Sequence, residues 1–124
     1  MAKAIPDAVL DVLLDEIATG TRIVVCSGQP ANYAGIAAVA LAEAALTPGA
    51  GNGDFTIANG DVSGRKLTVA QQTGLDIDVS GDATHVSIDD GSSLLAVTTC
   101  TTQTLTSGGT VTIPAWDIEV SDPA

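Results

Sequence analysis

The stretch THVSIDDGSSLLAV, residues 84–97, gives the clearest indication of the fold class. Apolar and polar residues alternate on both sides of an Asp90-Gly91 pair. The alternating apolar residues are Val86, Ile88, Leu95 and Val97. A period of two places one face of a β-strand on a core, and Asp-Gly between two such runs is typical of a tight turn. The stretch therefore predicts two antiparallel strands joined by a turn.

The same period of two extends outward over the chain from Phe55 to Val120. The alternating apolar residues are Phe55/Ile57, Leu67/Val69, Leu75/Ile77/Val79, Val86/Ile88, Leu95/Val97, Val111/Ile113 and Trp116/Ile118/Val120. Turn residues separate these runs, at Asn59-Gly60, Ser63-Gly64, Thr73-Gly74, Ser80-Gly81, Asp90-Gly91 and Ser107-Gly108-Gly109. Short strands with closely spaced turns are typical of meanders and Greek keys. We predict a mainly β fold, an antiparallel β-sandwich or barrel-like meander, with one N-terminal amphipathic α-helix.

That helix is predicted over residues 6–19, ending at Gly20. Its apolar residues recur at helical spacing, and acids at 7, 11, 15 and 16 occupy the other side. The apolar stripe must be buried on the body of the protein or on a neighbouring subunit. It forms our candidate interface, made of Val9, Leu10, Leu13, Leu14 and Ile17.

The remaining segments belong to the same domain, which we expect to span residues 1–124. Thr21–Ser27 is an apolar run that predicts a buried strand and opens a β-rich body over residues 21–124. The Ala-rich segment Tyr33–Leu46 fits neither the helical nor the strand period, so pattern alone leaves it open. Residues 47–53 are Gly-rich and predict a surface loop.

The charge, the lengths of the apolar runs and the spacing of the cysteines disfavour several classes of function. The chain has 124 residues and a formal net charge of -11, and such a charge disfavours binding to nucleic acid and to anionic membrane surfaces. No apolar run is long enough to span a bilayer, and Asp7 interrupts the first apolar segment, so we expect a soluble protein made in the cytoplasm. Cys26 and Cys100 lack the spacing of a zinc or redox site and are expected to be simple buried thiols.

Each chemically suggestive residue has a structural interpretation that we favour. The segment 76–81 resembles the start of a calcium loop, but Ser87 stands where that loop needs a carboxylate. His85 lies with Ser87 and Asp89 in a row on the outward side of one strand, and a row cannot converge on one reacting atom. Trp116 is expected to be a core ring. We therefore assign no catalytic, cofactor or metal residue and predict that the protein is not an enzyme.

The order of segments resembles a group of small virion proteins of tailed bacteriophages. The resemblance covers nearly the whole chain, and its motifs are turns and strands. They are the N-terminal Pro6-Asp7-Ala8 helix start, Thr21–Pro30 with Asn32-Tyr33-Ala34, Ser63–Lys66, Gly81–His85, Asp89–Ser92, Thr106–Gly109 and Pro114–Glu119. The resemblance implies that Tyr33–Leu46 is extended or loop-like.

Within that group the resemblance favours a head decoration, or cement, protein. Such a protein binds the outer surface of the phage head and stabilises contacts between subunits of the major capsid protein, which would be its partner. Exposed edges of short strands need covering, which favours a homo-oligomer such as a trimer. The alternative is a phage tail or host-contacting binding module that recognises a glycan or receptor. No nucleic-acid or membrane partner is expected.

Overall fold

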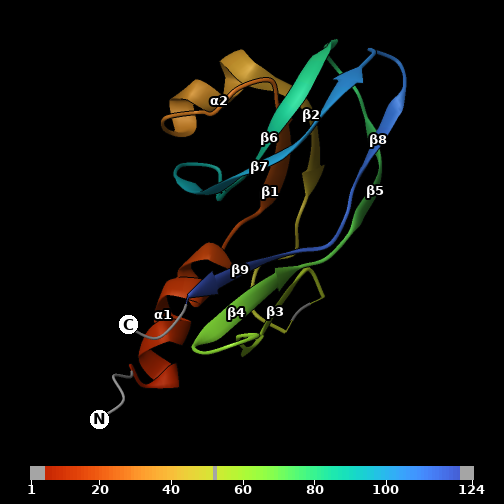
Figure 1. The fold of residues 1–124 in the computed structure, drawn as a ribbon. Coiled ribbons are helices and arrows are strands. Elements are labelled where there is room, and N and C mark those ends of the chain that lie inside the picture. The colour runs from red at the N-terminus through yellow and green to blue at the C-terminus, as the bar shows by residue number, and fades with distance from the viewer. Residues whose placement is uncertain (1–4, 52, 121–124) are drawn as a thin grey trace.

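A computed structural model describes residues 5–51 and 53–120 of the protein. Two helices and nine strands form within this described part of the chain (Figure 1). Their bounds are α1 Asp7–Ile17, β1 Arg22–Cys26, α2 Tyr33–Val39, β2 Ala40–Ala45, β3 Phe55–Asn59, β4 Arg65–Val69, β5 Gln72–Asp76, β6 Gly81–Asp89, β7 Leu94–Leu105, β8 Thr110–Ile113 and β9 Trp116–Val120. The predicted mainly β class with one N-terminal helix is confirmed.

The largest sheet has four antiparallel strands in the order β2-β1-β6-β7. The hairpin predicted from residues 84–97 forms one side of this sheet as β6 and β7, with Val86 opposite Thr98 and Ile88 opposite Ala96. The buried run predicted at 21–27 is β1, which pairs with β6 on one side and β2 on the other. Within the described residues β7 is left as an edge strand, paired with β6 alone.

The second half of the β structure is a long antiparallel ribbon. Only two residues separate β4 from β5, and only Pro114 and Ala115 separate β8 from β9. The β4–β9 pair and the β5–β8 pair therefore follow one another along the ribbon. The ribbon bends between them at Pro114, because Pro has no N–H to donate to a strand ladder. The ribbon joins the first sheet where the N–H groups of Asp78 and Val79 donate to the Leu41 carbonyl.

The core lies between the sheet and the ribbon, with α1 packed against its lower end (Figure 1). Its fully buried side chains include Leu14 of α1, Ile88 of β6 and Phe55 of β3. Outside the core, Asp11 of α1 accepts from the Nε of Arg65 at 2.8 Å and ties the helix to β4. The helix is therefore fixed to the body by both apolar and charged contacts.

The Ala-rich segment forms a helix and then a strand, so the expectation that Tyr33–Leu46 is extended is wrong for its first half. The N-cap is Asn32, whose side-chain oxygen accepts from the Gly35 N–H at 2.9 Å. Ile36 is buried with Val24 and Cys26 on the face of the sheet opposite the main core. Burial of this one side chain holds α2 on the sheet, and the chain becomes extended again at β2.

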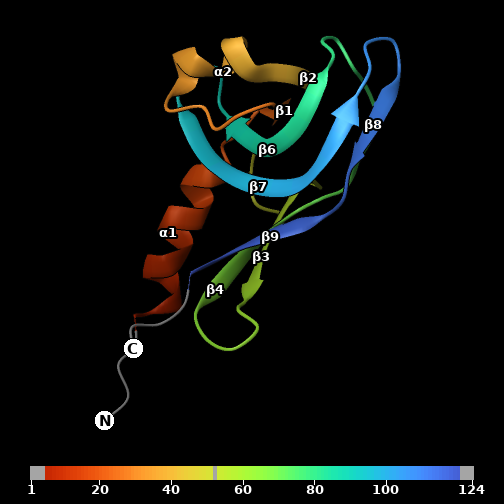
Figure 2. The same cartoon turned by 45° about the horizontal axis from the view of Figure 1, so that its top comes forward.

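The prediction that Ser87 and Asp89 point outward is wrong. Both are fully buried, because α2 packs over the second face of the sheet (Figure 2). The buried Asp89 carboxylate accepts from the Nε of Arg22 at 2.9 Å and from the Gly91 N–H at 3.0 Å. Both faces of β6 are therefore packed, although the alternation of polar and apolar residues predicts that one face is exposed to water.

The predicted turns are observed with two exceptions. At Ser80-Gly81, Gly81 is already the first residue of β6 and lies opposite Leu105. Thr73-Gly74 lies inside β5, where the pairing with β8 shifts register and Gly74 has a positive φ of 66°. A bulge of this kind needs a residue that tolerates positive φ, which accounts for the Gly there.

Candidate functional site

The five apolar residues of α1 that we predicted as an interface are not alike in burial, since some are buried in the protein and others are exposed. Leu10, Leu14 and Ile17 are buried at 4%, 0% and 8% exposure, so they pack on the protein's own body. Val9 and Leu13 remain 58% and 52% exposed. The first three are therefore unavailable to a partner, and the stripe as predicted does not form one surface.

The exposed side of α1 also includes Val12, which is 67% exposed and which the sequence analysis missed. Val9, Val12 and Leu13 stand at i, i+3 and i+4 and share one side of the helix, which we name the outer α1 face. The signal for Val12 was present, since it follows Val9 by one helical turn. Among the described residues, five large hydrophobic side chains are exposed, and three of them make up this face.

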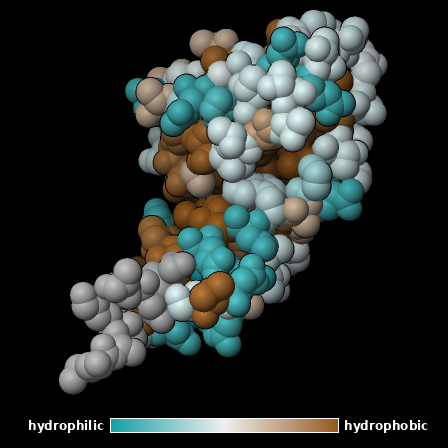
Figure 3. Space-filling view, viewed as in Figure 1, coloured by the Kyte–Doolittle hydropathy of each residue, from teal (hydrophilic) through white to brown (hydrophobic). Residues whose placement is uncertain are grey.

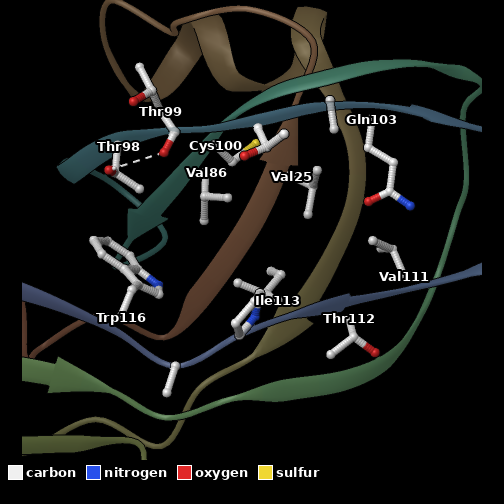
Figure 4. A pocket seen from close by; sticks show the side chains of 14 residues that line it. Val25, Val86, Thr98, Thr99, Cys100, Gln103, Val111, Thr112, Ile113 and Trp116 are labelled. Atoms are coloured by element: carbon white, nitrogen blue, oxygen red, sulfur yellow. Dashed lines mark hydrogen bonds between the residues drawn. The ribbon is translucent and has the colours of Figure 1, made fainter.

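A second candidate site is a cavity of about 400 Å³ between β7 and the β8–β9 part of the ribbon, which we name the seam pocket (Figure 4). Figure 3 shows apolar side chains exposed in this hollow. The lining residues are Val25, Ala83, Val86, Thr98, Thr99, Cys100, Thr101, Gln103, Val111, Thr112, Ile113, Pro114, Ala115 and Trp116. The volume lies within the range of pockets that hold small ligands or side chains.

The lining is uncharged, and its polar side chains are four Thr and one Gln. Trp116 is a half-buried side chain that packs against the core, as expected of a core ring, and it also forms a wall of the pocket. Its Nε1 is buried and has no hydrogen-bond partner in residues 5–51 and 53–120. Burial raises the pKa of the Cys100 thiol, so the neutral form is favoured and the side chain is a poor nucleophile. The pocket is therefore suited to binding uncharged groups.

Apart from Trp116 and Cys100, the candidate residues considered from the sequence do not line this pocket. His85 shares its face of the sheet with Cys26 and has its Nδ1 2.8 Å from the hydroxyl of Thr84. Both cysteines are free thiols, with Cys26 buried and Cys100 partly buried. Within the part of the chain that the structure describes, no three His, Cys, Asp or Glu side chains gather as a metal site would require.

Two further findings concern the chain as a whole. Across the described ranges, neither helix is long and apolar enough to cross a membrane. Comparisons with protein-family models, with curated proteins and with solved structures found no match for this chain. The two candidate sites therefore rest on their own geometry.

Proposed function

We propose that the protein is a structural virion protein, a decoration protein that binds the outer surface of a phage head and stabilises contacts between major capsid subunits. The outer α1 face is the observation that carries this proposal. A soluble chain rarely leaves neighbouring apolar side chains exposed on a firmly held helix unless another surface covers them. The sequence resemblance to small virion proteins supplies the partner.

The way α1 is held supports a docking role. Leu10, Leu14 and Ile17 anchor the inner side of the helix, and the Asp11–Arg65 pair fixes its first half. Little conformational entropy would then be lost when a partner covers the outer side. We propose the major capsid protein as that partner, with a further copy of the chain, in a trimer, completing the contact.

The charge of the chain supports a place outside the shell. A net charge of -11 would be repelled by packaged DNA, whereas basic patches on the outer capsid surface would attract it. This proposal includes no catalytic role, no cofactor, and no nucleic-acid or membrane partner.

The alternative is a tail or host-contacting binding module. The seam pocket favours it, because a half-buried Trp with a free ring N–H is a common element of ligand sites. A glycan or receptor group would then occupy the pocket, and the outer α1 face would serve to attach the module to the particle.

The test is to strip the protein from particles, add it back and measure the temperature of genome release. The wild-type chain should raise that temperature, because binding to the intact shell stabilises it by mass action. Val9→Asp should abolish the rise by placing a carboxylate on the outer α1 face. Val79→Asp is the matched control, because Val79 is similarly exposed, at 53%, but lies outside α1. No rise with the wild-type chain would reject the decoration role.

A further inference from the structure

The strands β7 and β8 follow one another through the turn at Thr106–Gly109 but are not hydrogen bonded to each other. Consecutive strands joined by a short turn ordinarily pair as a hairpin. Here β7 pairs with β6 and β8 pairs with β5, and within the described residues their other edges face the seam pocket from opposite sides (Figure 4). The barrel-like arrangement is therefore open along one seam.

The pocket lies beside two edge strands and against the inner face of the sheet. It contacts residues 98–101 of β7 and residues 111–116 of β8, β9 and the bend between them. The register of β7 against β6 shifts within the first of these stretches, so the alternation of side chains is interrupted there and consecutive residues reach the pocket. Val25 of β1 and Val86 of β6 add side chains from the face of the sheet. Because β7 and β8 are each paired along one edge within the described residues, their other edges border the pocket.

The edge of β7 lacks most of the features that keep edge strands from pairing. Its 12 residues, Leu94–Leu105, include no charged residue and no Pro, although the chain has 15 acidic and 4 basic residues. Proteins ordinarily protect a long edge with charges, Pro, short length or a bulge. β7 has only the last of these, in two register shifts, one opposite Ala83–His85 and one opposite Ile88–Asp89. An edge so long and neutral is suited to accepting another strand.

A strand that fills the seam must pair with β7 on one side and with β8–β9 on the other. Both of its own edges must therefore be free. Every strand in the described part of the chain is already paired along at least one edge, so a folded second copy cannot supply it from these strands. A small molecule would leave most of the two facing rows of backbone groups unpaired. An extended segment of another protein satisfies them, as in strand addition to sheet edges.

We infer that the seam pocket binds an extended, uncharged segment of a partner protein, about six residues long, as an added strand between β7 and β8–β9. The length follows from the lining residues, which extend from 98 to 103 on β7, with Thr102 left out, and from 111 to 116 on β8–β9. One backbone carbonyl of the segment accepts from the Nε1 of Trp116, a buried donor that has no acceptor among the described residues. This inference goes beyond the proposed function, since it holds for any location of the protein on a particle.

The binding test uses the isolated full chain and the four peptides acetyl-(Thr-Xaa)3-amide, where Xaa is Ala, Val, Leu or Ile. Trp116 is the single tryptophan of the sequence and lines the pocket, so its fluorescence and its one indole N–H resonance report directly on the site. At least one peptide should give a saturable change in emission and a downfield shift of that resonance. Peptides methylated on alternate backbone nitrogens should bind at least about tenfold more weakly, because they lose donors along one edge.

Matched variants of β7 locate the site. Thr101 is exposed and lines the pocket, while its neighbour Thr102 is equally on the surface but does not line it. Thr101→Asp should weaken peptide binding at least about tenfold, since it places a charge beside the incoming strand. Thr102→Asp should bind as the wild type does. Because both side chains are exposed, both variants should fold, which circular dichroism would check.

Three results would overturn the inference. The first is the absence of any Trp116 response to all four peptides. The second is equal weakening by Thr101→Asp and Thr102→Asp. The third is saturable binding of benzene, used as a small apolar probe, without peptide binding, which would make the seam a small-ligand cavity. Since the experiment uses no particles, its failure is separate from failure of the decoration role.

Discussion

Position 20 requires Gly because the core leaves no room there for a Cβ atom, and not because the backbone adopts a conformation that only Gly tolerates. A Cβ built there would lie 2.5 Å from Cγ2 of Ile88 and 3.4 Å from Cζ of Phe55, both core side chains. We predict that Gly20→Ala lowers the free energy of unfolding by about 1–3 kcal/mol through overpacking, measured by urea denaturation. Gly28→Ala is the control, because its Cβ would meet only Val39, at 3.7 Å, and should change stability little. Equal effects of the two substitutions would contradict this explanation.

At the scale of elements, α1 has a structural side and a free side. We predict that Leu14→Ala, in the core, costs about 2–5 kcal/mol of stability in the isolated chain. Leu13→Ala, on the outer α1 face, should cost less than about 1 kcal/mol there, because the side chain is already 52% exposed. Denaturant unfolding measures both. A large loss for Leu13→Ala in a chain shown to be monomeric would mean that the outer face packs on the protein itself.

At the scale of the whole molecule, the net charge of -11 should govern how copies share a capsid surface. Exposed charges are screened over about 10 Å at 0.1 M salt and about 30 Å at 0.01 M. We predict that retention on particles weakens as ionic strength falls, measured by the amount bound after dilution into low salt. The double variant Asp76→Asn/Asp78→Asn has a net charge of -11 + 2 = -9. A smaller fraction of this variant than of the wild-type chain should be released from particles at low salt. Stronger retention at low salt would instead show that attraction to basic capsid patches outweighs repulsion between copies.

The charge-free run of β7 and the Pro114 bend were visible in the sequence, yet neither indicated the seam pocket. The pocket exists because β7 pairs with its neighbour β6 while β8 pairs with β5, and the second of these pairings joins residues far apart in the chain. Likewise, Trp116 fits a core position by its alternation, since the pattern shows which face is apolar but not what lies opposite it.

The strands other than β2, most of the turns and the N-terminal helix could be predicted from the sequence alone, because they depend on periods of two and 3.6 residues and on turn residues close together in the chain. What covers each face depends on the tertiary packing. Asp89 and Ser87 follow a surface pattern but are buried, because Ile36 brings α2 over them. Leu10 and Leu13 are alike in sequence, but the body of the protein reaches only the first. Local spacing encodes amphipathic faces, whereas burial depends on long-range packing that no local pattern contains.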